Sequence, residues 1–566
     1  MGPEIWVNTP PLDAALGWAI GTTTAPTIGL SLALVAPLLA VGAAAVLRRH
    51  PQAAAEQAWR TVQRAMTAGG VAALAAAVVL GLQASVATPA PAAPSAPEAW
   101  LTLTPLGAVL AVLVQGLAVV IAAFSSRYLQ GDAQGPAGQR SHASALAGVL
   151  ASVQVLLLAN HWVLLIAAWA AVGLCLQPLL CFYSERPFAL LAAHKKRLAD
   201  RLADALLTAA ATLAWREAGS GHLDTVAAEV SRQVAEGAVS GGLQASAVLL
   251  VLAVVLRTAL LPVHGWIIQV MEAPTPVSAL LHAGVVNLGG LVLIRQATLI
   301  EASPVAQGLL VGLGVATAVL AGLVMMTRIS IKVRLAWSTV AQMGFMVMEC
   351  GLGLYTLAAL HLIGHSLYKA HAFLASSSAV QHTRQQRLRG RATPSTWSLL
   401  AAPLLSMALI AGVQAAIAPT AWPLWWTAVL ALAWAPLLWV PRAGPDTAAA
   451  QPLLAAAAGA SITVALAALA TLAHALPHAL ALRDTPAGAA GWAAAAALGL
   501  LYAALVALQR WPQRLSVWRR WSYAGFYVDE AYTRLTLRLW PTRWTPHRRA
   551  DHDVWAPSCA PQGASD

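Results

Sequence analysis

Charged residues are scarce in this chain of 566 amino acids, and their scarcity excludes an ordinary soluble enzyme. Asp, Glu, Lys and Arg make up 10% of the residues and hydrophobic types 59%. A soluble domain, by comparison, has about 25% charged residues. The composition therefore indicates a protein that crosses a membrane several times.

Sequence motifs for bound cofactors are also lacking. The four cysteines form no CxxC pair and no zinc-ligand spacing, so neither a disulfide framework nor an iron–sulfur or zinc centre is indicated. There is no Walker A loop for ATP hydrolysis and no GxGxxG after a predicted strand for nicotinamide or flavin binding. We expect no cofactor in this chain.

The chain is basic, with a formal net charge of +12. Its Lys and Arg residues gather in short segments between apolar stretches, as in the cytoplasmic loops of membrane proteins. We therefore expect a lipid bilayer around the protein and no nucleic acid as a partner. No basic region precedes the first apolar stretch, so we expect no cleaved signal peptide.

Apolar stretches long enough to cross a bilayer predict an all-α polytopic membrane protein with about 15 transmembrane helices. The stretches cover residues 26–47, 66–87, 103–124, 144–160, 162–183, 200–215, 243–261, 275–295, 304–327, 333–350, 353–379, 396–418, 421–441, 450–474 and 488–508. Two of them, 144–160 and 200–215, are short for a span.

The basic segments follow odd-numbered stretches. They contain Arg48, Arg49, Arg60 and Arg64 after the first, Arg186, Lys195, Lys196 and Arg197 after the fifth, Arg328, Lys332 and Arg334 after the ninth, and Arg384, Arg387, Arg389 and Arg391 after the eleventh. Because Lys/Arg-rich loops stay in the cytoplasm, we expect a multi-pass protein of the plasma (inner) membrane with a periplasmic N-terminus and a cytoplasmic C-terminus. The tail 509–566, rich in Arg and Trp, suits either a headgroup anchor or a solvated segment.

Residues 271–284, Met-Glu-Ala-Pro-Thr-Pro-Val-Ser-Ala-Leu-Leu-His-Ala-Gly, begin a span that two prolines break. Pro274 and Pro276 lack backbone donors and prevent a continuous helix. In hydrocarbon, irregular backbone is tolerated only where protein or a polar cavity satisfies it. A break beside an ionisable residue therefore indicates an ion pathway. His282 follows the break, and Arg257 ends the span before it.

His361, His365 and Lys369 are spaced four residues apart in one apolar stretch. On a helix each such step turns by about 40° and rises about 6 Å, so the three side chains form a stripe. Ionisable groups in a membrane usually line a polar interior, and the stripe predicts a proton relay. The alternative is a set of satisfied polar side chains that join helices. An HxxxH step can bind metal, but no third ligand accompanies it, so we expect no metal.

Four other residues each have two interpretations. Asp204, one turn after Arg201, forms a gate-like ion pair or an interfacial pair at the start of its span. Lys332 is a loop cation or a member of the pathway, and Glu349 is a proton exit or an interfacial residue. Arg257 can bias the pKa of a neighbour or hold an anion, but a guanidinium is a poor proton carrier.

Three long segments resemble the proton-translocating antiporter-like subunits of respiratory complex I and of Mrp antiporters. They run from Leu261 to His282, from Ile331 to Thr339 and from His361 to Ser376. The resemblance implies inverted five-helix repeats with one broken helix in each. It also implies proton-pathway roles at Asp204, Arg257, His282, Lys332, His361, His365 and Lys369.

The same resemblance divides the chain into five parts. They are 1–100, N-terminal transmembrane helices; 101–295, a first repeat region with the broken helix; 296–441, a second repeat region; 442–508, C-terminal transmembrane helices; and 509–566, a basic cytoplasmic or interfacial tail.

Two charges of the family pattern are missing. The family usually has a glutamate at the position of Ala170, which pairs with a lysine at the position of Arg257. The second repeat lacks the lysine or glutamate of its twelfth span, because residues 392–441 contain no ionisable side chain. The long lateral helix of the complex I member is also not expected, since only about 58 residues follow the last span.

This altered pattern most resembles the membrane subunit of two-component inorganic-carbon transporters of autotrophic bacteria. The resemblance implies a partner, a large zinc protein related to β-carbonic anhydrases. Protons or sodium ions that cross this chain would drive the activity of that partner. Zinc is then expected in the partner only, and this chain is a transporter subunit rather than an enzyme. The alternatives are an antiporter-like subunit of an NADH–quinone or hydrogenase complex, and a stand-alone antiporter or structural membrane scaffold.

Overall fold

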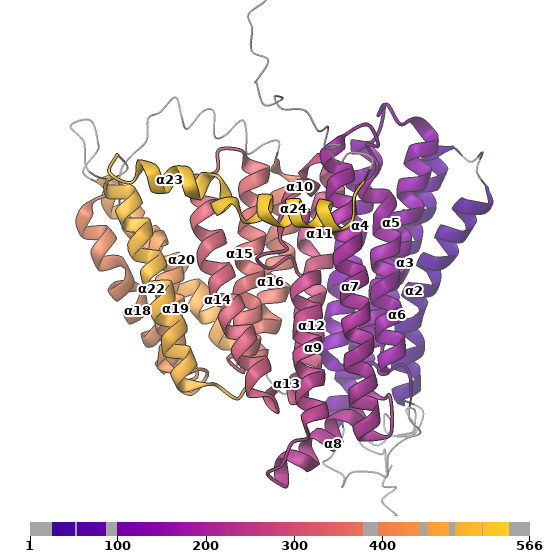
Figure 1. Cartoon of the computed structure of the whole chain (residues 1–566), viewed down its shortest axis with the longest axis horizontal. Coiled ribbons are helices and arrows are strands. Elements are labelled where there is room, and N and C mark those ends of the chain that lie inside the picture. The colour runs from indigo at the N-terminus through magenta and orange to yellow at the C-terminus, as the bar shows by residue number, and fades with distance from the viewer. Residues whose placement is uncertain are drawn as a thin grey trace, which may run out of the picture.

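Helices cross the molecule side by side and form a broad slab in this computed structural model (Figure 1). The structure describes residues 25–50, 52, 54–86, 99–376, 394–440, 442, 450–474, 482–511 and 513–542. No β-strand forms within these residues, which confirms the all-α prediction. The basic segment predicted after the eleventh stretch lies outside the described residues.

Every predicted stretch coincides with a helix or with a pair of helices. They are α2 (Ala25–Arg49), α3 (Ala55–Val86), α4 (Pro105–Tyr128), α5 (Gly135–Leu158), α6 (Trp162–Leu180), α7 (Pro187–Ala218), α9 (Gly241–Arg257), α11 (Thr275–Ala283) with α12 (Leu288–Arg295), α14 (Pro304–Thr327), α15 (Ile331–Gly351), α16 (Tyr355–Leu374), α18 (Thr396–Ile417), α19 (Leu424–Trp434), α20 (Ala450–His474) and α22 (Gly488–Arg510).

Among the described residues, 10 of these spans are long and apolar enough to cross a membrane by composition alone. The others fail that test for two reasons. Helices α9 and α19 are short, whereas α7, α15 and α16 contain charged or histidine side chains. Because charge inside a membrane is costly, these last three helices are where a polar pathway should be sought.

Helix α7 corrects the sixth predicted span. It begins at Pro187 and has 32 residues, whereas the sequence pattern placed the start near residue 200 and assigned Lys195 and Lys196 to a loop. Both lysines are helical and buried. Asp204 consequently lies in the middle of the helix rather than at its start.

The predicted break lies at the centre of the slab. Helix α9 ends at Arg257, and the chain turns through residues 258–264 before the short helix α10 (Gly265–Gln269) and the 3-10 turn η1 (Val270–Glu272). Helix α11 then starts at Thr275, and a second 3-10 turn, η2 (Val285–Asn287), separates it from α12. The span from α11 to α12 is 94% buried, the highest share among the 10 spans. Its irregular backbone is therefore enclosed by protein, as the membrane requires.

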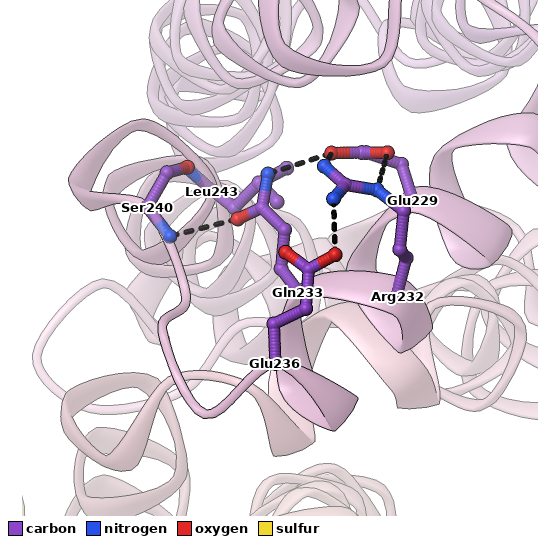
Figure 2. Close-up of polar contacts among 6 residues, drawn as sticks. All are labelled: Glu229, Arg232, Gln233, Glu236, Ser240 and Leu243. Atoms are coloured by element: carbon purple, nitrogen blue, oxygen red, sulfur yellow. Dashed lines mark hydrogen bonds and ion pairs between the residues drawn. The ribbon is translucent and has the colours of Figure 1, made fainter.

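Helix α8 (Leu223–Ala235) lies at one end of the slab, and we name that surface the α8 face (Figure 1). Arg232 bonds both carboxylate oxygens of Glu229 and also Glu236, while the Gln233 amide links Glu229 to the Ser240 backbone (Figure 2). Hydrogen bonds from Arg232 and Gln233 lower the pKa of Glu229 to about 2. This network ends α8 and fixes the turn into α9.

The chain after α22 doubles back across the opposite surface, the tail face, as α23 (Ser516–Tyr523) and α24 (Val528–Leu539) (Figure 1). We call this segment the tail strap. Asp529 accepts hydrogen bonds from Lys195 Nζ at 2.7 Å and from Gln269 Nε2 at 3.0 Å. A Cβ at Gly265 would lie 1.4 Å from Asp529 Oδ1, so the absence of a side chain there makes room for the carboxylate. Ser522 bonds the Leu323 carbonyl of α14 at 3.0 Å. The tail strap thus joins the broken region to α14.

Candidate functional site

The central ionisable side chain is His282 on α11. It is fully buried and stacks on Phe373 of α16, with ring centroids 4.4 Å apart. Neither ring nitrogen has a hydrogen-bond partner among the described residues. A buried polar group without a partner is costly, and such groups in native proteins usually serve a function. The break thus places an imidazole against the helix that carries the predicted stripe.

Lys369 lies beside His282 in the stripe on α16 and is also fully buried. Its Nζ donates to Ser338 Oγ at 2.7 Å and to the Leu335 carbonyl at 3.1 Å. Both acceptors belong to α15 and are neutral, and no carboxylate forms an ion pair with this lysine within the described part of the chain. A buried amine that only neutral oxygens hold can release its proton at low cost.

The stripe continues from Lys369 toward the N-terminal end of α16. The rings of His365 and His361 have centroids 6.0 Å apart, and His361 Nδ1 lies 2.8 Å from Glu349 Oε2 of α15. Both nitrogens of the buried His365 ring lack hydrogen-bond partners among the described residues. His371, by contrast, lies off the stripe and is exposed. The predicted row therefore has a fourth member, Glu349.

Lys332 contacts the broken helix directly. It stands at the start of α15, and its Nζ donates to Thr275 Oγ1 at 2.8 Å, the first residue of α11. The Thr275 hydroxyl in turn donates to Tyr128 at the end of α4. This contact ties the lysine to the break.

Arg257 and Asp204 form a second cluster in the first half of the protein. The Arg257 guanidinium is buried, pairs with the Asp204 carboxylate and donates to the Trp169 carbonyl at 2.7 Å. Arg257 Nε also lies 3.8 Å from Asp200 Oδ1. The partner of Asp204 is therefore Arg257 of α9, not Arg201 as the sequence spacing indicated.

Two further members of this cluster, Lys196 and Asp200, were not predicted from the sequence. Lys196 pairs with Asp200 one turn along α7, and both are buried. Together with Arg257 and Asp204 they give two positive and two negative groups. The carboxylates that neutralise Arg257 come from α7, which explains how α6 can have Ala170 at the position where a glutamate was expected. The i, i+4 spacing of Lys196, Asp200 and Asp204 was the signal in the sequence.

A cavity of about 850 Å³ opens beside the stripe, between α14, α15 and α16 on one side and α19, α20 and α22 on the other. Its walls are mostly apolar, and its polar lining includes Glu349, His361 and His365. The outer part of the stripe therefore borders an open space, whereas Lys369 and His282 are enclosed by protein.

The structure thus separates the seven predicted residues into groups. Direct contacts join Asp204 to Arg257, Lys332 to the start of α11, and His361 to Glu349 next to His365. His282 and Lys369 lie between the last two groups. No ion pair or hydrogen bond links the Arg257 cluster to His282 among the described residues.

Known proteins place the chain in a family. The profile described as "NADH:quinone oxidoreductase/Mrp antiporter, TM" matches residues 159–440. The "Probable inorganic carbon transporter subunit DabB" of Hydrogenovibrio crunogenus is 38% identical over 459 residues, which span 78% of this chain and 84% of that protein. The chain belongs to the DabB family of antiporter-like membrane subunits.

Other relatives of this DabB-family chain match shorter segments. DabB2 of Halothiobacillus neapolitanus is 43% identical over 309 residues, 55% of each chain. NADH-quinone oxidoreductase subunit L of Mycobacterium tuberculosis is 31% identical over 333 residues, 57% of this chain and 51% of that protein. The chain thus matches about half the length of these two.

A solved Mrp complex from Dietzia supports the fold. It aligns with a TM-score of 0.52 and 24% identity over 91% of this chain and 60% of the Mrp chain. The DabB-family chain therefore has the antiporter-like architecture that the three sequence segments predicted, and it is an integral membrane protein with many spans.

Proposed function

We propose that this DabB-family chain conducts protons across the plasma membrane and couples their flow to inorganic-carbon accumulation by a partner protein. The row formed by Lys369, His365, His361 and Glu349 is the observation that carries the proposal. Imidazole and amine groups exchange protons readily, whereas hard cations such as sodium prefer oxygen ligands. We therefore favour protons over sodium.

The proposed path runs from the tail face to the α8 face. Lys332 at the start of α11 stands at the first end, His282 and Lys369 form the enclosed middle, and the two histidines of the stripe lead outward. With basic loops in the cytoplasm, the tail face is cytoplasmic and the α8 face periplasmic.

The proposed partner is a DabA-like protein, a large zinc protein related to β-carbonic anhydrases. It would hydrate carbon dioxide to bicarbonate, and its zinc would perform that chemistry outside this chain. The carbon-transporter names of the relatives at 38% and 43% identity favour this partner. The alternative, a subunit of an NADH–quinone or hydrogenase complex, is favoured by relatives at 32% and 31% identity over about half of the chain.

Purification from the native membrane in mild detergent tests the proposed function. We expect one large zinc protein to co-elute with the chain and bicarbonate uptake by the intact complex to stop when a protonophore collapses the proton gradient. Co-elution of flavin and iron–sulfur subunits, or uptake that survives the protonophore, would contradict the proposal. Replacement of a sodium gradient by a potassium gradient should leave uptake unchanged.

We further propose that Arg257 closes the first half of the protein to protons. Its guanidinium stays charged and is held by two carboxylates and a backbone carbonyl. The pair of substitutions Arg257→Lys and Ala170→Glu should then raise proton leak in liposomes, because a lysine can release its proton. Ala170→Gln with Arg257→Lys is the matched control without the new carboxylate. A leak equal to that of the wild type would count against the closed first half.

A further inference from the structure

The Glu349–His361 pair lies where the stripe approaches the α8 face. Glu349 is two residues from the end of α15 and is almost completely buried. Its Oε2 lies 2.8 Å from His361 Nδ1, and His361 is the only hydrogen-bond partner of the Glu349 side chain among the described residues. A carboxylate next to a histidine and close to the end of a helix is placed to pass protons between that histidine and groups beyond the helix end.

A segment from the far end of the chain covers this helix end. The Thr485 backbone N–H donates to the Gly353 carbonyl at 2.8 Å, and the Ala487 N–H donates to the Leu352 carbonyl at 3.0 Å. Gly353 has φ +73°, and a Cβ there would lie 2.2 Å from the Thr485 carbonyl oxygen. Glycine thus allows residues 484–487 to bind the α15–α16 turn closely.

This attachment brings Asp484 to the same place. Its Oδ1 accepts the backbone N–H of Thr356, in the first turn of α16, at 2.8 Å. Its Oδ2 faces His474 Nε2 at 3.9 Å, and its charge acts on Glu349. Burial raises the pKa of the Asp484 carboxyl above its ordinary value. The segment therefore presents a second carboxyl, with its own histidine, outside the first carboxyl–histidine pair.

We propose that Glu349 and Asp484 form the outer mouth of the proton path, with His474 beside it. This inference rests on the proposed proton conduction and extends it beyond the seven predicted residues. Asp484 takes a proton from water at the α8 face and passes one toward Glu349. Glu349 Oε2 then gives a proton to His361 Nδ1, His361 passes one on toward His365, and each group returns to its starting charge.

A purely structural role for Asp484 is the competing explanation, because a carboxylate is a good cap for a helix N-terminus. Two substitutions separate these roles. Asp484→Asn keeps the acceptor for the Thr356 N–H, since Asn caps as well as Asp, but it cannot carry a proton. Glu349→Gln likewise keeps a hydrogen-bonding group opposite His361. Glu301→Gln is the control, because Glu301 accepts a bond from Thr485 at 2.5 Å on the same face but lies off the stripe.

The measurement is proton flux driven by a potassium diffusion potential in liposomes that contain the complete complex. We expect Glu349→Gln and Asp484→Asn each to lower the flux at least tenfold, with Glu301→Gln near the wild type. Glu349→Asp, which restores a carboxyl, should recover part of the flux and shows that folding is not the cause. Wild-type flux in either of the first two variants would overturn this outer mouth. If Lys369→Met still stops the flux, proton conduction stands without the Glu349–Asp484 mouth, whereas normal flux in Lys369→Met would overturn conduction itself.

Discussion

Replacement of Lys369 by Met is expected to abolish proton flux and bicarbonate uptake while the complex still assembles. The amine is the most enclosed member of the row, and only a hydroxyl and a backbone carbonyl hold it. Methionine fills the same space but carries no proton. Since a buried charge destabilises a protein unless it is paired, we also expect an equal or higher unfolding temperature in the variant. Loss of flux without loss of stability distinguishes a pathway residue from a structural one.

Two further variants sharpen this test. Lys369→Arg keeps a positive charge that is effectively never released, so its flux should be as low as that of Lys369→Met. His365→Ala should also stop uptake, whereas His371→Ala, on the exposed side of the same helix, should not. Flux and uptake are measured in liposomes and in intact cells. Normal uptake in a Lys369→Met/His365→Ala double variant would end the relay hypothesis.

The second large effect is expected from Arg257→Met. The substitution leaves Asp204 without its partner and removes the donor to the Trp169 carbonyl. Breaking a buried ion pair costs about 3–5 kcal/mol, and we expect the lower end, about 3 kcal/mol, because about a quarter of the Asp204 side chain is exposed. The free energy of unfolding in mixed micelles measures the loss.

A double variant shows whether the loss comes from the pair. Arg257→Met/Asp204→Leu replaces both charges by apolar groups, which is often neutral or stabilising for a buried pair. The coupling energy from the four proteins then isolates the interaction. A double variant that is as unstable as the single one would mean that Arg257 acts through Trp169 or Asp200 instead. Arg201→Met is the control, since Arg201 forms no ion pair among the described residues.

The spans could be predicted because length and apolar character decide whether a segment crosses a bilayer. The predicted starts were too late for α3, α5 and α7. In α3 and α7 charged residues interrupt the apolar pattern and were taken for a loop, although Arg60, Arg64, Lys195 and Lys196 are helical. Lys195 and Lys196 are buried because carboxylates from other turns or helices pair with them. A sequence window shows the charge but not the partner that makes burial possible.

The stripe on α16 was predictable because its residues share one helix and its geometry follows from the helical period. Contacts between distant segments were not. Glu349 meets His361 across a helix hairpin, Asp204 meets Arg257 from 53 residues away, and the Asp484 segment reaches the same helix end from 128 residues away. Such partners depend on the packing of whole helices, and a single sequence taken alone does not specify that packing.

The tail strap has a consequence for biosynthesis. Asp529, which pairs with Lys195, follows it by 334 residues. At about 5–20 residues per second, a ribosome needs roughly 20–70 s after it makes this lysine before it makes the aspartate. During that time the first half enters the membrane with a cation whose carboxylate does not yet exist. The final packing around α10 therefore belongs to the last stage of synthesis, and a chain that stops after α22 would have to keep Lys195 hydrated or neutral.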